Sequence, residues 1–321
     1  MSLALLFSPQ GSQAVGMGRA LADASPSARS VFERADAALG WSVSQLAFEG
    51  PEARLNDTRY TQPALVTMSV ATAHALSEAL AAEGDDLDPA FVAGHSVGEY
   101  AALVMAEVLS LEDAVRLVAL RGELMASQDV EGGMSAVIGL DRGAVAAAIE
   151  PFAGPDGSDL VVANDNAPGQ VVISGLRHAL AAADEALAAA GAKRVMPLRV
   201  SGPFHSPHMR PVGEALERAF ADATWRDARI PLISNVTADP ITDAFEIRAL
   251  LARQVSAPVE WVACIERLAG EGVDTFVECG PGAALTGMVR RIVPGARLHA
   301  AGDPDGVARA AAAIRTAGAS V

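Results

Sequence analysis

The stretch Phe91-Val92-Ala93-Gly94-His95-Ser96-Val97-Gly98-Glu99-Tyr100 decides the fold class of this chain. A short apolar strand is followed at once by a match to G-x-S-x-G and then by a helical pattern, as a nucleophile elbow requires. The two glycines permit a sharp turn that leaves the Ser96 hydroxyl exposed. The N–H of Val97 would lie at the helix N-terminus, where backbone donors stabilise an oxyanion. The alternative is a glycine-serine turn that only caps a helix.

Outward from this turn, short apolar runs alternate with longer helical patterns. A helix over 63–82 is predicted to carry Pro63 in its first turn. The other elements predicted around it are strands at 3–7, 91–93, 232–234 and 273–277, and helices at 97–104, 111–127, 211–221, 259–269 and after 282. This alternation predicts an α/β fold with a mainly parallel sheet and helices on both faces, similar to the α/β-hydrolases.

The middle of the chain has a different pattern, in the order β-α-β-β-α-β. Strands are predicted at 134–140, 160–163, 170–174 and 194–198, and helices at 142–150 and 177–190. This order is typical of a ferredoxin-like unit, with Asn164–Gly169 as the hairpin loop between its halves. We therefore predict a large catalytic domain over 1–129 and 198–321, and an inserted small domain over 130–197.

Composition excludes several classes of protein. The chain has 321 residues, of which 51% are hydrophobic, so a sizeable core can form. The formal net charge of −15 argues against a nucleic-acid-binding protein. The two cysteines, Cys264 and Cys279, are too few for a zinc cluster and are predicted to be reduced core thiols. No segment approaches the ~20 apolar residues of a membrane span, and no signal peptide is apparent, so we expect a cytoplasmic location.

A serine nucleophile needs a base, and histidine is the usual one. The six histidines are His74, His95, His178, His205, His208 and His299. His205 lies in a loop that follows a strand, and this position favours it weakly, with His208 as the competitor. His95 adjoins Ser96, but neighbouring side chains diverge on such a turn, so it is expected to support the elbow. His74 and His178 lie in helical patterns and are expected to be structural.

Several motifs in order make the chain resemble the malonyl-CoA:acyl carrier protein transacylase family over nearly its whole length. These motifs are Gln10-Gly11-Ser12-Gln13 with Gly16-Met17-Gly18, Thr61-Gln62-Pro63-Ala64, Gly94–Tyr100, Arg121-Gly122 with Met125, Asn166–Gln170, Gly202–Ser206, Gln254 with Pro258-Val259 and Trp261, and Glu278 with Gly280-Pro281-Gly282. One departure is Ser8-Pro9-Gln10, where the family usually has Pro-Gly-Gln. This change affects the loop that carries Gln10.

The resemblance implies roles for particular residues. Ser96 is expected to be the acylated nucleophile, and His205 its general base and later its acid. A backbone carbonyl near Gln254 is expected to orient the imidazole in place of a carboxylate. The N–H groups of Gln10 and Val97 are expected to form the oxyanion hole.

Arg121 is the residue on which the resemblance bears most. An arginine on a helix is usually a solvated surface charge. By similarity, however, Arg121 is expected to pair with the free carboxylate of a malonyl group, which a planar guanidinium binds through two parallel hydrogen bonds. Val97 and Phe204 resemble the malonyl-type pattern of polyketide acyltransferases, so malonyl is expected rather than methylmalonyl.

The implied reaction is a ping-pong transfer of malonyl from malonyl-CoA to the phosphopantetheine thiol of acyl carrier protein. No metal or cofactor is expected, since malonyl-CoA is a substrate, and a monomer is expected. The carrier is acidic, so docking needs local cations. The candidates are Lys193-Arg194, Arg210 and Arg290-Arg291. The alternatives are a free-standing acyltransferase of a polyketide synthase, a serine esterase or thioesterase, and a non-catalytic carrier-docking protein.

Overall fold

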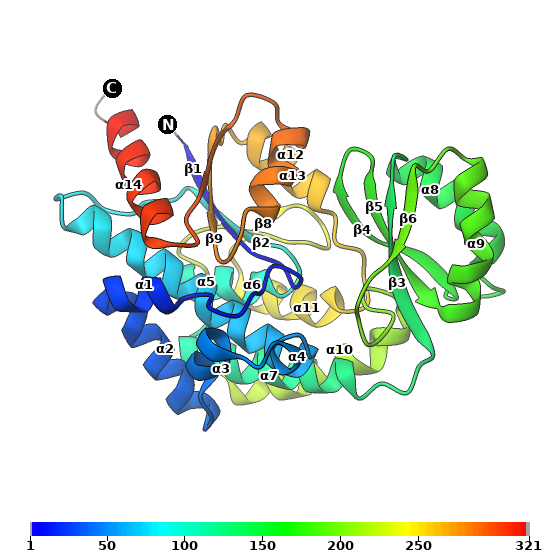
Figure 1. The fold of residues 1–321 in the computed structure, drawn as a ribbon, viewed down its shortest axis with the longest axis horizontal. Helices are drawn as coiled ribbons and strands as arrows, with labels where there is room; N and C mark the ends of the chain where they lie inside the picture. Colours follow the sequence, from blue (N-terminus) through cyan, green and yellow to red (C-terminus); the bar gives the residue numbers. More distant parts are fainter. Residues whose placement is uncertain (1, 319–321) are drawn as a thin grey trace.

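Strand β1 (Leu3–Phe7) lies inside a six-stranded sheet in the computed structural model, which describes residues 2–318 (Figure 1). The strand order is β10-β9-β1-β2-β7-β8. The other strands of this sheet are β2 (Phe91–Gly94), β7 (Leu232–Ile233), β8 (Pro240–Ile241), β9 (Thr275–Cys279) and β10 (Arg297–Ala300), of which β9 and β2 flank β1. All pairs are parallel except β7 with β8. The predicted mainly parallel α/β fold is therefore confirmed.

Helices cover both faces of this sheet. Alternate residues of a strand point to opposite sides, so each central strand contributes to two cores. Leu5 and Phe7 belong to one apolar core, shared with α5 and α7, whereas Leu6 belongs to a second core, shared with α12 and α13. The helices are α1 (Arg19–Ala24), α2 (Pro26–Leu39), α3 (Val43–Glu49), α4 (Glu52–Leu55), α5 (Thr58–Ala81), α6 (Gly98–Met105), α7 (Leu111–Ala126), α8 (Arg142–Ile149), α9 (Arg177–Ala189), α10 (Arg210–Ala219), α11 (Ala244–Gln254), α12 (Trp261–Gly270), α13 (Ala284–Ile292) and α14 (Pro304–Gly318), with short 3-10 turns η1 (Glu150–Phe152), η2 (Pro207–Met209) and η3 (Phe220–Asp222). The sequence patterns above did not predict α1–α4, α11 or α14.

Helix α5 begins earlier than predicted. It begins at Thr58, where the Asp57 side chain accepts a hydrogen bond from the Arg59 N–H, so Pro63 lies inside the helix and not in its first turn. By length and composition, α5 is also the one helix among residues 2–318 that could cross a membrane, although no such segment was expected. Its most apolar window is 72% buried, and it packs against α2 and α7, so it is a core helix.

The middle of the chain forms a separate antiparallel sheet in the order β4-β5-β3-β6, the strand order of a ferredoxin-like unit. Its strands are β3 (Gly132–Ile138), β4 (Leu160–Ala167), β5 (Gln170–Leu176) and β6 (Arg194–Pro197). The predicted hairpin loop at Asn164–Gly169 is wrong in extent, because β4 continues through two register shifts to Ala167 and only Pro168-Gly169 turn. The domain boundaries at 129/130 and 197/198 stay a prediction.

The connection between β2 and α6 requires glycine at two positions. A Cβ at Gly94 would lie 1.9 Å from the backbone carbon of Gly98, and a Cβ at Gly98 would lie 2.2 Å from the carbonyl oxygen of Phe7. Both distances are far below van der Waals contact, and backbone atoms cannot move aside as a flexible side chain can. The two glycines therefore let α6 begin directly against β1 and β2, with the serine of the motif between them.

Candidate active site

Ser96 lies at the turn between β2 and α6 in the left-handed region of backbone conformation, with φ of 52°. This conformation is costly for a residue with a side chain and persists where neighbouring contacts hold it. Asn235, which follows β7, supplies such contacts. Its Oδ1 accepts from the Ser96 N–H at 2.7 Å, and its Nδ2 donates to the Gly94 carbonyl at 2.7 Å. One amide side chain thus bridges the two sides of the turn.

The Ser96 hydroxyl contacts His205, which lies 109 positions further along the chain. Ser96 Oγ is 2.7 Å from His205 Nε2, and His205 Nδ1 is 3.0 Å from the Gln254 carbonyl and 3.2 Å from the Ala257 carbonyl. Carbonyl oxygens only accept, so Nδ1 carries the proton and Nε2 offers its lone pair to the serine hydroxyl. The geometry therefore suits proton abstraction from Ser96.

The surroundings of His205 keep its imidazole neutral. Burial, reinforced by the nearby Arg121 charge, lowers the pKa of His205 to about 3. Hydrogen bonds from Nδ1 to the two carbonyls act in the opposite direction but do not offset burial. The lone pair on Nε2 is therefore available at every pH near neutrality.

Arg121, on α7, lies beside the serine and is only 1% exposed. Its Nη1 donates to Gln62 Oε1 at 2.7 Å, and its Nη2 donates at 3.1 Å both to Gln254 Oε1 and to Ser96 Oγ. Its Nε has no hydrogen-bond partner, and no ion pair to it occurs among residues 2–318. Burial lowers the pKa of Arg121, yet an arginine stays charged. A buried cation held by neutral amides leaves room for an anionic ligand.

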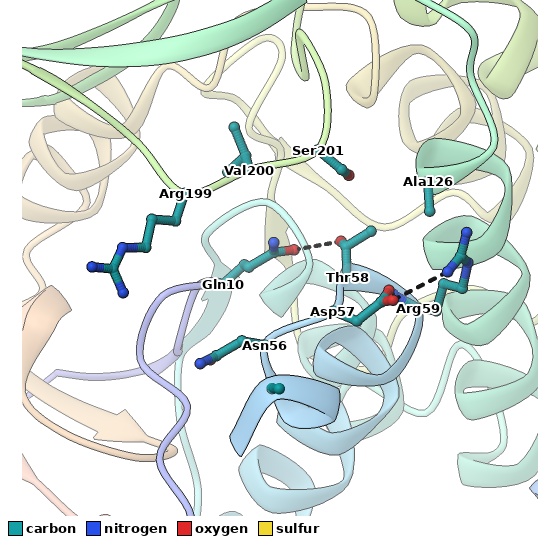
Figure 2. A pocket seen from close by; sticks show the side chains of 10 residues that line it. Gln10, Asn56, Asp57, Thr58, Arg59, Ala126, Arg199, Val200 and Ser201 are labelled. Carbon is teal, nitrogen blue, oxygen red and sulfur yellow. Dashed lines mark hydrogen bonds and ion pairs between the residues drawn. The ribbon is translucent and has the colours of Figure 1, made fainter. Parts of the chain in front are cut away.

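The two predicted oxyanion donors differ in how the structure presents them. In the described part of the chain, neither the Gln10 N–H nor the Val97 N–H donates to any acceptor. Gln10 lines the cleft that contains Ser96, whereas Val97 is 1% exposed and does not line it. Figure 2 shows the Gln10 carboxamide turned toward Thr58, whose hydroxyl donates to Gln10 Oε1 at 2.9 Å. The roles of both N–H groups stay predictions.

A chain of hydrogen bonds connects Gln10 to Arg121. Gln62 accepts from Arg121 and donates to the Thr58 hydroxyl at 3.0 Å, and Thr58 in turn donates to Gln10. Beyond Gln10 lies a more open hollow of about 270 Å³ (Figure 2). Gln10 and Val200 line both this hollow and the cleft, so the two spaces are adjacent.

The cleft around Ser96 has a volume of about 160 Å³ and is mostly apolar. Phe204, assigned above to substrate specificity, is 4% exposed and forms part of its wall. The other lining residues are Pro9, Gln10, His95, Ser96, Arg121, Met125, Met134, Asn164, Asn166, Val172, Leu198, Val200, His205 and Met288. The space fits a short acyl group with a polar end near Arg121.

The other histidines take no part in the serine contact. His95 is buried, with its ring centroid 5.2 Å from that of Trp261 and the two rings tilted by 58°. Its Nε2 is 2.8 Å from Asn166 Oδ1, and this bond joins the elbow to β4 of the small sheet. Burial lowers the pKa of His95 to about 4. His208, the competing candidate for the base, lies in η2 and has no contact with Ser96. His299 is on β10, and His178 lies in the first turn of α9.

Four residues of the site had no role in the sequence analysis: Gln62, Glu99, Asn166 and Asn235. Gln62, Glu99 and Asn166 stand within motifs quoted there, and their positions next to Pro63, Gly98 and Ala167 were the available signal. Their partners lie far away in the sequence, so the pairing could not be derived from spacing. Asn235 follows a short strand and carried no signal of its own.

Neither cysteine lines the cleft around Ser96. Cys264 and Cys279 are both buried and free. Within the described range 2–318, no group of three or more His, Cys, Asp or Glu side chains is placed to hold a metal ion. The titratable groups that line the cleft are His95, Arg121 and His205, and Glu99 is buried behind them.

Comparisons with known protein families, sequences and structures all indicate the same family of acyltransferases. The acyl transferase domain profile matches residues 4–303. The chain is 41% identical over 305 residues to "Malonyl CoA-acyl carrier protein transacylase" of Bacillus subtilis, covering 94% of each chain. A crystal structure of an acyl carrier protein S-malonyltransferase from Vibrio cholerae superposes with a TM-score of 0.90 at 38% identity, covering 97% of this chain and 100% of that one. A malonyl-transacylase in complex with a type II PKS acyl-carrier protein gives a TM-score of 0.91 at 38% identity, with 98% and 100% covered.

Proposed function

This chain belongs to the acyl transferase domain family and, within it, to the malonyl CoA-acyl carrier protein transacylases, and we propose that it transfers malonyl from malonyl-CoA to the thiol of an acyl carrier protein through an ester on Ser96. The acceptor that we propose first is the carrier protein of fatty acid synthesis. The proposal concerns the residues that carry out the transfer and the order of the two half-reactions.

In the first half-reaction, His205 Nε2 takes the proton of the Ser96 hydroxyl as Oγ attacks the thioester carbonyl. The contact of 2.7 Å lies within the range required of a general base. Negative charge develops on the former carbonyl oxygen, and the unpartnered N–H groups of Gln10 and Val97 are the donors proposed to stabilise it. The C–S bond then breaks, and the proton on Nε2 passes to the CoA thiolate.

In the second half-reaction, the thiol of the carrier's phosphopantetheine arm enters the same cleft. His205 takes its proton, the thiolate attacks the malonyl-serine ester, and the proton returns to Ser96 Oγ as the C–O bond breaks. The Gln254 and Ala257 carbonyls stabilise the imidazolium that forms in both half-reactions, since each accepts from Nδ1.

The observation that carries the proposal is the buried, unpaired cation beside the nucleophile. Arg121 Nη2 is 3.1 Å from Ser96 Oγ, and Arg121 makes no ion pair among the residues that the structure describes. An acyl group on Ser96 with a carboxylate at its far end would supply the missing anion. A neutral acetyl group would leave the charge unpaired, so the site should discriminate strongly between the two.

The test is a transfer assay with malonyl-CoA, methylmalonyl-CoA and acetyl-CoA, each with a holo acyl carrier protein, followed by mass spectrometry of the carrier. We expect the malonyl ester on the carrier and a kcat/KM for malonyl-CoA at least ~10²-fold above that for acetyl-CoA. Equal loading of acetyl would remove Arg121 from its role. Release of free malonate in place of carrier loading would make the protein a thioesterase.

A polyketide carrier is the second candidate acceptor, because one superposed relative is in complex with a type II PKS acyl-carrier protein. Loading rates on a fatty acid carrier and a polyketide carrier, measured side by side, decide between the two. The proposed docking cations Lys193-Arg194, Arg210 and Arg290-Arg291 are exposed, although Arg291 also donates to Gln170 and to the Pro168 carbonyl. We also propose a monomer located in the cytoplasm.

A further inference from the structure

We propose that Glu99 is a positioning residue that orients the Gln254 amide and the Asn235 side chain, and through them sets both the malonyl selectivity of Arg121 and the shape of the elbow at Ser96. The inference rests on the proposed function and extends it to a residue outside the cleft. Glu99 neither lines the cleft around Ser96 nor contacts the His205 imidazole, so it is not a catalytic residue.

The carboxylate of Glu99 is enclosed in the protein and accepts from two different elements. Glu99 lies in the first turn of α6 and is 3% exposed. Its Oε1 accepts from the Asn235 N–H at 2.6 Å, and its Oε2 accepts from Gln254 Nε2. Both contacts favour the ionised form, whereas burial raises the pKa of Glu99 to about 8.

The contact between Glu99 and Gln254 decides which end of the Gln254 amide faces Arg121. Ionised Glu99, the form present above its pKa of about 8, only accepts, so its Oε2 binds the NH₂ end of the amide. The Oε1 end is then turned to Arg121 Nη2 at 3.1 Å, while Nε2 also donates to the Ser96 carbonyl. The reversed amide would place its NH₂ group against the guanidinium, with two donors facing each other. Glu99 thus keeps an acceptor on the inner side of Arg121.

The contact between Glu99 and the Asn235 N–H fixes the backbone of Asn235, the residue whose side chain bridges the elbow. Asn235 receives the Glu99 oxygen at its own N–H, while its side chain spans from the Ser96 N–H to the Gly94 carbonyl. Asn235 is fully buried, so no water can replace these bonds. One carboxylate therefore joins the two supports of the site, one behind Arg121 and one behind Ser96.

The test compares Glu99→Gln with a matched control, Glu278→Gln. Glu278 on β9 is also a fully buried carboxylate that accepts from backbone N–H groups, those of Leu285 and Thr286, but it lies outside the cleft. Both variants are assayed at pH 9, above the pKa of Glu99. The readouts are kcat and KM for malonyl-CoA and for acetyl-CoA, together with the thermal midpoint.

We expect Glu99→Gln to lower the malonyl-to-acetyl ratio of kcat/KM about tenfold, chiefly through malonyl KM, because the amide behind Arg121 can reverse. Glu278→Gln should lower the thermal midpoint and leave that ratio within about twofold. The double variant Glu99→Gln with Arg121→Ala should show the same ratio as Arg121→Ala alone, since both changes act on one interaction. An unchanged ratio in Glu99→Gln, or an equal change in Glu278→Gln, would overturn the proposal.

Two further arms keep the test decisive. Should Glu99→Gln not fold, Gln254→Met removes the intervening amide at similar volume, and it must lower the same ratio about tenfold for the proposal to stand. Failure of the proposed function gives a different result from failure of the Glu99 role, because the wild-type protein would then load no malonyl onto the carrier. A selective wild type whose ratio survives Glu99→Gln would refute only the role of Glu99.

Discussion

The two walls of the cleft differ in the kind of side chain they contribute. The side built on the parallel sheet brings Ser96, His205 and Arg121, each held by hydrogen bonds from elements far apart in the sequence. The side built on the antiparallel sheet brings Met134, Asn164, Asn166 and Val172, none of which is charged. Every titratable group that lines the cleft therefore lies on one wall.

This difference indicates that the two walls have separate roles: one carries the charged and proton-transferring groups, and the other shapes the cleft. Charges and proton transfer need fixed geometry, and a sheet buried on both faces with a tight elbow supplies it. An uncharged wall can define the width of the cleft without adding a charge beside His205 and Arg121. The walls are joined where His95 meets Asn166 and where the Val259 N–H donates to the Ala163 carbonyl. Variants on the two sides should therefore differ in size and kind of effect.

The largest effect is expected from His205→Ala, on the charged wall. Loss of the general base should lower kcat for malonyl transfer at least ~10³-fold, and the thermal midpoint should also fall, because the Gln254 and Ala257 carbonyls lose their buried donor. Stopped-flow measurement of CoA release in the first turnover is the direct readout. A kcat within tenfold of the wild type would show that another group takes the Ser96 proton.

The next effect is expected from Arg121→Ala. Without the guanidinium, kcat/KM for malonyl-CoA should fall about 10²-fold, while that for acetyl-CoA falls less, so selectivity relaxes. Arg116→Ala is the matched control, because Arg116 lies on the same helix with its side chain 57% exposed and should leave both values unchanged. Retained selectivity in Arg121→Ala would move malonyl recognition to another residue.

The pH dependence of acylation should differ from that of an ordinary histidine. The reaction needs neutral His205, so the rate is lost as pH falls through the pKa of that residue, which burial places at about 3. At pH 5 the rate should remain near its neutral value, whereas a base with the usual pKa of 6.5 would lose about 30-fold. Short pH jumps with rapid quench avoid slow acid unfolding. A half-maximal rate near pH 6.5 would contradict the assigned environment of His205.

The smallest effect is expected on the uncharged wall, from Asn166→Ala. The variant leaves His95 Nε2 without its acceptor at 2.8 Å, so the free energy of unfolding should fall by about 1–3 kcal/mol. The KM for malonyl-CoA should rise only a few-fold, with kcat nearly unchanged. Denaturant titration and steady-state kinetics measure the two quantities. A kcat loss as large as that of His205→Ala would end the distinction between the walls.

The fold could be predicted from sequence where local patterns were strong. The run from Phe91 to Tyr100 was enough to place a strand, a turn and a helix, and the β-α-β-β-α-β order was enough to predict the second sheet. The extent of β4 could not be read, because Asn164-Asp165-Asn166 has the composition of a turn and is held as strand by pairing with β5 and Val259.

The site could be predicted only in part, for the same reason. Ser96 followed from its motif, His205 was favoured weakly by its loop, and Arg121 rested on family resemblance alone. The supports of these groups, Gln62 and Glu99 among them, act through contacts that exist only after the chain has folded. Buried amides and carboxylates of this kind have no spacing rule, so the structure was needed to find them.

The most direct test of the central claim is the intact mass of the protein after incubation with malonyl-CoA in the absence of carrier, with peptide mapping of any adduct. We expect one malonyl group, on Ser96, that leaves when holo acyl carrier protein is added, and no adduct on a folded Ser96→Ala variant. A malonyl group on Ser96→Ala, or on any residue other than Ser96 in the wild type, would contradict that claim.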